Sequence, residues 1–269
     1  MPIALFSVML SPTALAWGAK GHLIVGQVAE AQICVSTREA LSFDLDDESI
    51  VEAGLWPDKI RGYDRWAYTK PWHYINVPDG VDIEKAKRSG KGDVLSAIAA
   101  QREELEYDSN LMKARREALR FLIHFVADVH QPLHVGRQED LGGNRIKVRS
   151  EQSLGSSNLH RYWDTDVLAE VSDPRAYAAE LLARVEPELV GWQPLQPLDW
   201  ARESADFRAA VYAYPEPPPG EKVYLDQAYY AKARQIADQR LVLAGLRLAA
   251  ELDSLYCGSE ERRARKQGR

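Results

Sequence analysis

The 269-residue chain contains little of what marks several protein classes. It has only two cysteines, and neither lies in a CxxC pair, which argues against zinc sites built from thiolates. It has no basic excess: a net charge of -6 argues against a broad basic face that grips duplex nucleic acid. No apolar run reaches the roughly 18 residues of a membrane span, and no asparagine lies in an N-x-S/T glycosylation site. What remains is the composition of an ordinary globular protein, with 45% hydrophobic and 28% charged residues.

The first 16 residues have the pattern of a signal peptide. An apolar stretch at 3–10 is followed by Ser-Pro and then by the sequence ALA at 14–16, an A-x-A cleavage pattern. A signal peptide usually has a Lys or Arg before its apolar stretch, and this chain has neither there. A buried first helix is the alternative, but Pro12 fits it poorly. We therefore expect cleavage before Trp17 and a secreted or periplasmic protein.

Export affects the interpretation of the two cysteines, and composition sets the expected domain bounds. In an oxidising compartment Cys34 and Cys257 could form a disulfide between the first and last helices, although two unpaired thiols explain them equally well. No linker separates two cores, so we expect one domain over residues 17–256. Residues 257–269 include EERRARKQGR and are expected to form a basic, disordered tail.

Helical periodicity dominates the expected domain. The predicted helices cover about 19–34, 36–44, 92–106, 111–131, 158–170, 174–187, 199–213 and 225–255. Residues 56–80 place prolines and glycines between aromatics and are predicted to form a long ordered loop, whereas GGNRIKVRS at 142–150 is typical of a strand or short hairpin. The fold class is therefore mainly α: a single-domain helical fold with long ordered loops and a short β-hairpin.

The sequence HFVADVHQPLH, residues 124–134, points to chemistry inside a buried helix. His124 and Asp128 are four residues apart and project from one helix face. Burying a carboxylate beside an imidazole is costly unless a metal ion or a His–Asp hydrogen bond compensates. The sequence HRYWD repeats this spacing with His160 and Asp164. Imidazole and carboxylate without thiolate suit zinc, manganese or iron, and several such sets indicate a multinuclear site that cleaves phosphate esters.

Six motifs give the chain a resemblance to a known family. WGAKGH, WPDKIR, WHYINV, HFVADVHQPLH, LGGN and HRYWD follow, in order and spacing, the S1/P1 nuclease family from Trp17 to about Leu255. The resemblance implies a mainly helical, phospholipase C/P1 nuclease-like fold with three zinc ions. It also implies cleavage of single-stranded DNA and RNA to 5'-phosphorylated products, and removal of 3'-phosphates from nucleotides.

The resemblance also implies a set of zinc ligands, each matched to one position of this chain. They are the amine and carbonyl of Trp17 together with His22 for the first ion; Asp58, His73 and His124 for the second; Asp128 as a bridge between these two; and His134, His160 and Asp164 for the third. Taken alone, Asp58 could equally cap a helix and His22 could be a core histidine. The prediction therefore depends on the whole set.

The remaining functional positions concern the substrate. By resemblance, Asp58 orients the attacking nucleophile and Arg61 stabilises charge on the phosphoryl oxygens. Asn144 contacts the phosphate and Tyr74 stacks on the base. Asn76 stands where some family members have a base-binding aspartate, so the base preference stays open.

Two other functions compete with a nuclease. A zinc-dependent phospholipase C-type phosphodiesterase is similar in fold and in the sequence motif that supplies its metal ligands. It has a glutamate where this chain has Asp164, however, and the presence of Arg61 with Asn144 fits the nuclease better. A secreted binding protein with structural zinc would be expected to show closed, thiolate-rich sites. We expect single-stranded DNA, RNA and 3'-nucleotides as substrates, with no membrane anchor and no obligate protein partner.

Overall fold

The structure is a computed structural model that describes residues 17–107, 111–153, 155, 157–185 and 196–258. The expected signal peptide and residues 259–269 of the expected tail lie outside these ranges. The helices are α1 (Ala19–Gln32), α2 (Val35–Leu45), α3 (Ile50–Ala53), α4 (Trp56–Ile60), α5 (Val94–Glu106), α6 (Met112–Val129), α7 (Leu159–Asp164), α8 (Pro174–Ala183), α10 (Pro197–Asp206), α11 (Arg208–Val211) and α12 (Gln227–Tyr256). Short 3-10 helices are η1 (Asp64–His73), η2 (Pro132–Val135) and η3 (Asp166–Leu168), and the strands are β1 (Lys147–Ser150), β2 (Ser157–Asn158) and β3 (Val223–Leu225). The expectation of a mainly helical fold is confirmed.

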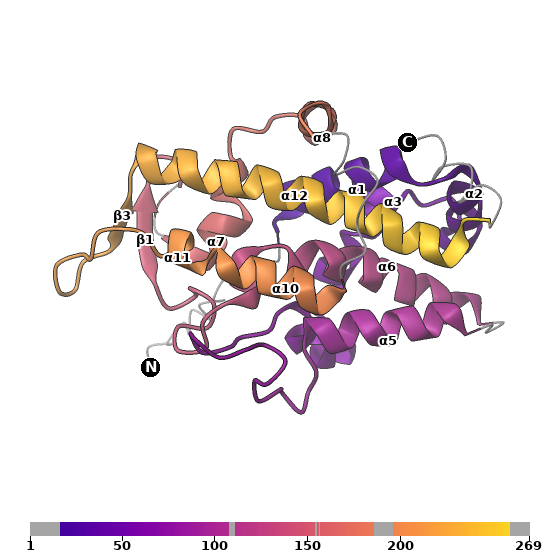
Figure 1. Ribbon diagram of the computed structural model, residues 1–269, viewed down its shortest axis with the longest axis horizontal. Coiled ribbons are helices and arrows are strands. Elements are labelled where there is room, and N and C mark those ends of the chain that lie inside the picture. The colour runs from indigo at the N-terminus through magenta and orange to yellow at the C-terminus, as the bar shows by residue number, and fades with distance from the viewer. Residues whose placement is uncertain (1–16, 108–110, 154, 156, 186–195, 259–269) are drawn as a thin grey trace, which may run out of the picture.

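The longest helix, α12, runs along the molecule with α1 beside it, although the two come from opposite ends of the described chain (Figure 1). Gly245 makes this close approach possible: a Cβ added there would lie 2.4 Å from the Cβ of Val28 on α1. On the other side of α1, Gly26 meets α3, where an added Cβ would lie 2.7 Å from the Cα of Val51. Small residues therefore hold α1 in the interior, and with it His22.

Helix α6 is the other central element, packed against α5, α1, α3, α10 and α12. Its second half is buried on every side, from Ala118 through Val129 apart from Arg120. A helix segment that is buried on every side lies in the core of the protein, since none of its faces is left to solvent. The helix ends at Val129 because Pro132 cannot continue it. Side chains near this end therefore lie in the interior of the molecule.

The structure corrects two parts of the sequence-based prediction. Residues 56–60 and 64–73, expected as loop, are α4 and η1. The short hairpin is present as antiparallel β1 and β2, with Val148 opposite Ser157, but β3 also pairs with β1 in parallel, with Val148 opposite Val223. The resulting three-stranded sheet lies at the end of the molecule where α12 begins (Figure 1).

Of the two alternatives for the cysteines, the structure has the disulfide: Cys34 is bonded to Cys257, with their Cα atoms 6.1 Å apart. The backbone N–H of Cys34 also donates to Asp253 Oδ1 at 2.9 Å. Both contacts join the start of α2 to the end of α12. Among the helices that the structure describes, none combines the length and apolar character needed to cross a lipid bilayer.

Candidate metal centre

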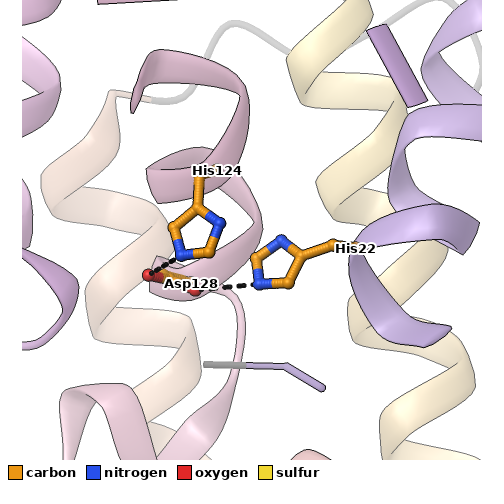
Figure 2. A group of neighbouring side chains, drawn as sticks. All are labelled: His22, His124 and Asp128. Atoms are coloured by element: carbon orange, nitrogen blue, oxygen red, sulfur yellow. Dashed lines mark ion pairs between the residues drawn. The ribbon is translucent and has the colours of Figure 1, made fainter. Parts of the chain in front are cut away.

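The end of α6 brings a carboxylate into contact with three imidazoles. Asp128 and His124 are both fully buried, and Asp128 Oδ2 lies 3.2 Å from His124 Nε2 and 3.0 Å from His73 Nδ1. The other oxygen, Oδ1, lies 3.5 Å from Nε2 of His22. Figure 2 shows His22 reaching Asp128 from α1, while His124 and Asp128 come from α6. The two imidazoles stack with their centroids 4.0 Å apart. Asp128 thus occupies the centre of the cluster.

Three histidines are oriented by backbone carbonyls. In each, Nδ1 lies within hydrogen-bond distance of a carbonyl oxygen, which can only accept, so Nδ1 carries the proton and Nε2 keeps its lone pair. The pairs are His124 with Gly54 at 2.7 Å, His134 with His73 at 2.6 Å, and His160 with Gly142 at 2.7 Å. This is the arrangement that fixes metal-binding histidines in other sites.

The LGGN sequence explains how one of these carbonyls reaches its histidine. Leu141 and Gly142 both adopt positive φ, at 57° and 62°. A Cβ on Gly142 would lie 2.5 Å from the carbonyl oxygen of Leu133, so only glycine fits there. The turn aims the Gly142 carbonyl at His160. The glycine therefore serves the orientation of a histidine 18 residues further along.

Three groups of His and Asp side chains among the described residues have donor atoms close enough to share a metal ion, all within 4.8 Å of one another in each group. The groups are His22, His124 and Asp128; Asp58, His73 and His124; and His134, His160 and Asp164. They contain every expected ligand except Trp17. His130 is not available as a metal ligand, because its Nδ1 is hydrogen-bonded to the Val126 carbonyl and its Nε2 to Arg247.

Burial keeps most of these imidazoles neutral. It lowers the pKa of His22 to about 3 and that of His73 to about 4, and it also lowers the pKa values of His134 and His160. His124 differs: burial acts in the same direction, but the attraction of Asp128 prevails and its pKa is raised. Neutral imidazoles offer lone pairs but little positive charge to balance the carboxylates.

The buried carboxylates Asp164 and Asp128 have opposite pKa shifts, and several donor atoms around them lack hydrogen-bond partners. Burial raises the pKa of Asp164 well above its usual value. For Asp128 burial acts in the same direction, yet the surrounding histidines hold its pKa well below the usual range. Five buried donor atoms have no hydrogen-bond partner among the described residues: Nε2 of His22, His73 and His134, Oδ1 of Asp128 and Oδ2 of Asp164. A cation at each group would satisfy these atoms.

Gln131 belongs to the third group although the sequence did not single it out. It is fully buried, and its Nε2 donates to Asp164 Oδ1 at 2.6 Å. Its Oε1 accepts the backbone N–H of Leu133, which fixes the direction of the amide. The available signal was its position inside HFVADVHQPLH, between two candidate ligands.

The start of α1 lies beside the third group. Trp17 is fully buried, and the N–H of Gly18 donates to the carbonyl oxygen of Asp164 at 2.7 Å. An added Cβ on Gly21 would lie 2.7 Å from the Cβ of Trp17, so the indole packs back over the first turn. This contact anchors α1 one turn before His22.

A pocket of about 240 Å³ opens onto the metal groups. Its lining residues are Arg61, His73, Tyr74, Asn76, His134, Leu141, Asn144 and His160. Arg61, the two asparagines and Tyr74 are the expected substrate-contacting residues, and the pocket gathers all four. The Arg61 guanidinium lies 3.2 Å from Asp58 Oδ1, which ties it to the second metal group.

Comparison with known proteins gives a consistent result over nearly the whole chain. A sequence model of the S1/P1 nuclease family matches residues 17–257. The chain is similar to Endonuclease 4 of Arabidopsis thaliana, with 31% identity over an alignment of 280 positions, gaps included, that covers 90% of each protein. It is 27% identical to Nuclease S1 of Aspergillus oryzae over 281 aligned positions, which cover 94% of this chain and 96% of that protein. It is also 27% identical to Nuclease P1 of Penicillium citrinum over 272 aligned positions, which cover 91% of this chain and 99% of that protein.

Proposed function

Because the chain belongs to the S1/P1 nuclease family and is a phosphodiester hydrolase, we propose that it cuts single-stranded DNA and RNA. The products would carry 5'-phosphates, and the enzyme would also remove 3'-phosphates from nucleotides. The observation that carries this proposal is the pocket that Arg61, Tyr74 and Asn144 line together with three histidines of the metal groups.

The metal ions we propose are three zinc ions. The donor set fits them: it consists of imidazole nitrogens and carboxylate oxygens, and five of its atoms are buried without a hydrogen-bond partner among the described residues. When bound, the ions would supply the Lewis acidity that makes water a nucleophile at neutral pH and neutralises phosphate charge. The proposed ligands are His22, Asp58, His73, His124, Asp128, His134, His160 and Asp164, with Trp17 completing the first site.

The part we assign to Trp17 depends on removal of residues 1–16. Its α-amine could bind a metal only as a free, neutral amine, because a peptide nitrogen is a poor ligand. The proposal is supported by the anchoring of α1 through Gly18 and Asp164, which keeps this end of the helix in the interior. Export to the periplasm or the exterior would provide the cleavage and suits the Cys34–Cys257 disulfide.

Asp58 and three side chains that line the pocket would act on the substrate directly. The Asp58 carboxylate orients the attacking water, and Arg61, held beside it, donates to the phosphoryl oxygens as their charge increases. The Asn144 amide donates to the Leu141 carbonyl at 2.8 Å, which holds it at the pocket wall for contact with the phosphate. Tyr74 is 39% exposed, so its ring is available to a base.

A substrate panel tests this proposal. Purified protein is given single-stranded DNA, RNA, 3'-AMP and phosphatidylcholine, each with and without chelator. We expect chelator-sensitive cleavage of the first three, with 5'-phosphates on the products. Hydrolysis of phosphatidylcholine alone would instead support the phospholipase C-type function. Activity on none of the four, with zinc tightly bound, would indicate a structural metal protein.

A further inference from the structure

A second pocket, of about 370 Å³, adjoins the first. Tyr74 and Asn76 line both pockets, so the two hollows share one wall. On the far side of this wall the lining includes Pro71, Lys87 and Arg88. We propose that this second pocket is a subsite for the backbone phosphate of a neighbouring nucleotide in the same strand. The inference rests on the proposed function, since it extends the substrate beyond the nucleotide whose base meets Tyr74.

The charges of the second pocket favour an anion. Arg88 and Lys87 are adjacent and exposed, and the guanidinium of Arg88 makes a two-pronged salt bridge with Asp93. That carboxylate is buried and also accepts the N–H groups of Leu95 and Ser96 at the start of α5. One arginine and one aspartate thus neutralise each other, and the charge of Lys87 remains. No acidic side chain among the described residues forms an ion pair with Lys87.

The shared wall is rigid, which a subsite requires. The N–H of Ile75 donates to the His134 carbonyl at 2.7 Å on the side of the metal groups. On the other side the carbonyl of Tyr74 accepts the N–H of Val94, at the start of α5, at 3.2 Å. The backbone at Tyr74 is therefore tied both to the metal centre and to the helix that Asp93 caps. A strand that crosses this wall would meet two fixed pockets in succession.

The arrangement suits an unpaired strand better than a duplex. A base can stack on the exposed ring of Tyr74 only if it is free to turn away from a partner strand. Its neighbour's phosphate would then pass over the wall toward Lys87, where a flexible ammonium group can meet it as a point charge. Longer substrates would gain this contact, whereas a mononucleotide would not reach it.

The test compares Lys87→Glu with Lys85→Glu, a matched charge reversal two residues earlier at an exposed position outside the pocket lining. Both variants are assayed for kcat/KM on 3'-AMP, a dinucleotide and an octathymidylate at several salt concentrations. For Lys87→Glu we expect a loss of roughly tenfold on the octamer at low salt, on the scale of a lost phosphate contact. The dependence of log KM on log salt should weaken by about 0.7, the contribution of one phosphate in a single strand.

Equal losses in the two variants, or an equal loss on the octamer and on 3'-AMP, would overturn the subsite. Binding separates this proposal from the proposed function. Fluorescence anisotropy of a labelled octathymidylate is measured with Arg61→Ala protein, with and without Lys87→Glu, so that cleavage is slow on the timescale of the measurement. Weaker binding caused by Lys87→Glu supports the subsite even if the wild-type protein fails to cleave single strands, whereas unchanged binding refutes it.

Discussion

The amide of Gln131 donates a hydrogen bond of 2.6 Å to Oδ1 of Asp164, while Oδ2 of the same carboxylate has no hydrogen-bond partner among the described residues. Because the Leu133 N–H holds the other end of the amide, Gln131 can present only its donor to Asp164. One carboxylate oxygen is therefore occupied and the other faces His160, at 3.5 Å from Nε2. Gln131 acts as a positioning residue for this part of the metal centre.

Gln131→Met should weaken metal binding at this group while preserving side-chain volume. Loss of a partner that orients a metal ligand costs roughly 10- to 100-fold in affinity. The measurement is competition with a calibrated zinc chelator, read as the number of ions retained, together with the melting temperature. Gln235→Met, at an exposed position on α12, is the control. Retention of all ions at wild-type affinity would show that Asp164 needs no such support.

Arg61→Ala should separate chemistry from metal binding. Turnover on single-stranded DNA is expected to fall roughly ten- to a thousand-fold, the effect of losing one transition-state donor, with metal content unchanged. Asp128→Asn should instead lose metal, because Asp128 contacts three imidazoles of two groups. Arg65→Ala removes an exposed arginine from the same segment and is the matched control. Full activity of Arg61→Ala would rule out its assigned role.

An added residue before Trp17 should inactivate the enzyme. A form that begins Met-Trp17 offers a peptide nitrogen in place of the α-amine, so we expect it to fold around two zinc ions and to lose most phosphodiesterase activity. Trimming to Trp17 should restore both the zinc ion of the first site and the activity. Intact mass, elemental analysis and turnover are compared for the two forms. If the blocked form is fully active, the amine is not a ligand.

Removing the disulfide should lower stability without changing the chemistry. The bond between Cys34 and Cys257 spans 223 residues of sequence. In the chain-entropy description, closing so long a loop raises the free energy of the unfolded state by about 5 kcal/mol. For a chain of this size that corresponds to a fall in Tm of about 10 °C or more. Cys34→Ser with Cys257→Ser is compared by calorimetry with oxidised wild-type protein, and reduced wild-type protein is the control. A wild-type Tm in the double variant would show that the bond adds nothing to stability.

The sequence predicted the parts of the molecule that depend on local pattern. The spacing of His124 and Asp128 within an apolar helix placed both on one face, and they lie together in the core. Residues 56–60 and 64–73 of the loop predicted at 56–80 are helical because aromatic packing stabilises α4 and η1: Trp56 and Trp66 both contact Phe121 of α6 edge-on. That packing is tertiary, and short helices interrupted by proline have no periodicity that reveals it.

Long-range partners account for the other omissions. Strand β3 pairs with β1 from 75 positions away, as Val148 opposite Val223 shows, and three residues carry too little pattern to predict a strand. Gln131 was missed because its partner Asp164 is 33 residues distant. An amide beside a proline looks like an ordinary loop residue until the carboxylate it orients is known.

The packing of α1 on α12 also sets an order of assembly during synthesis. Helix α1 leaves the ribosome early, but its principal neighbour begins only at Gln227. Until that helix emerges, α1 lacks the neighbour with which it makes its most extensive contact, even though every proposed metal ligand, up to Asp164, has already been made. A chain that is interrupted before α12 would carry all the residues of the centre without the scaffold that gathers them. Under the proposed function, an unfinished copy would be a harmless nuclease.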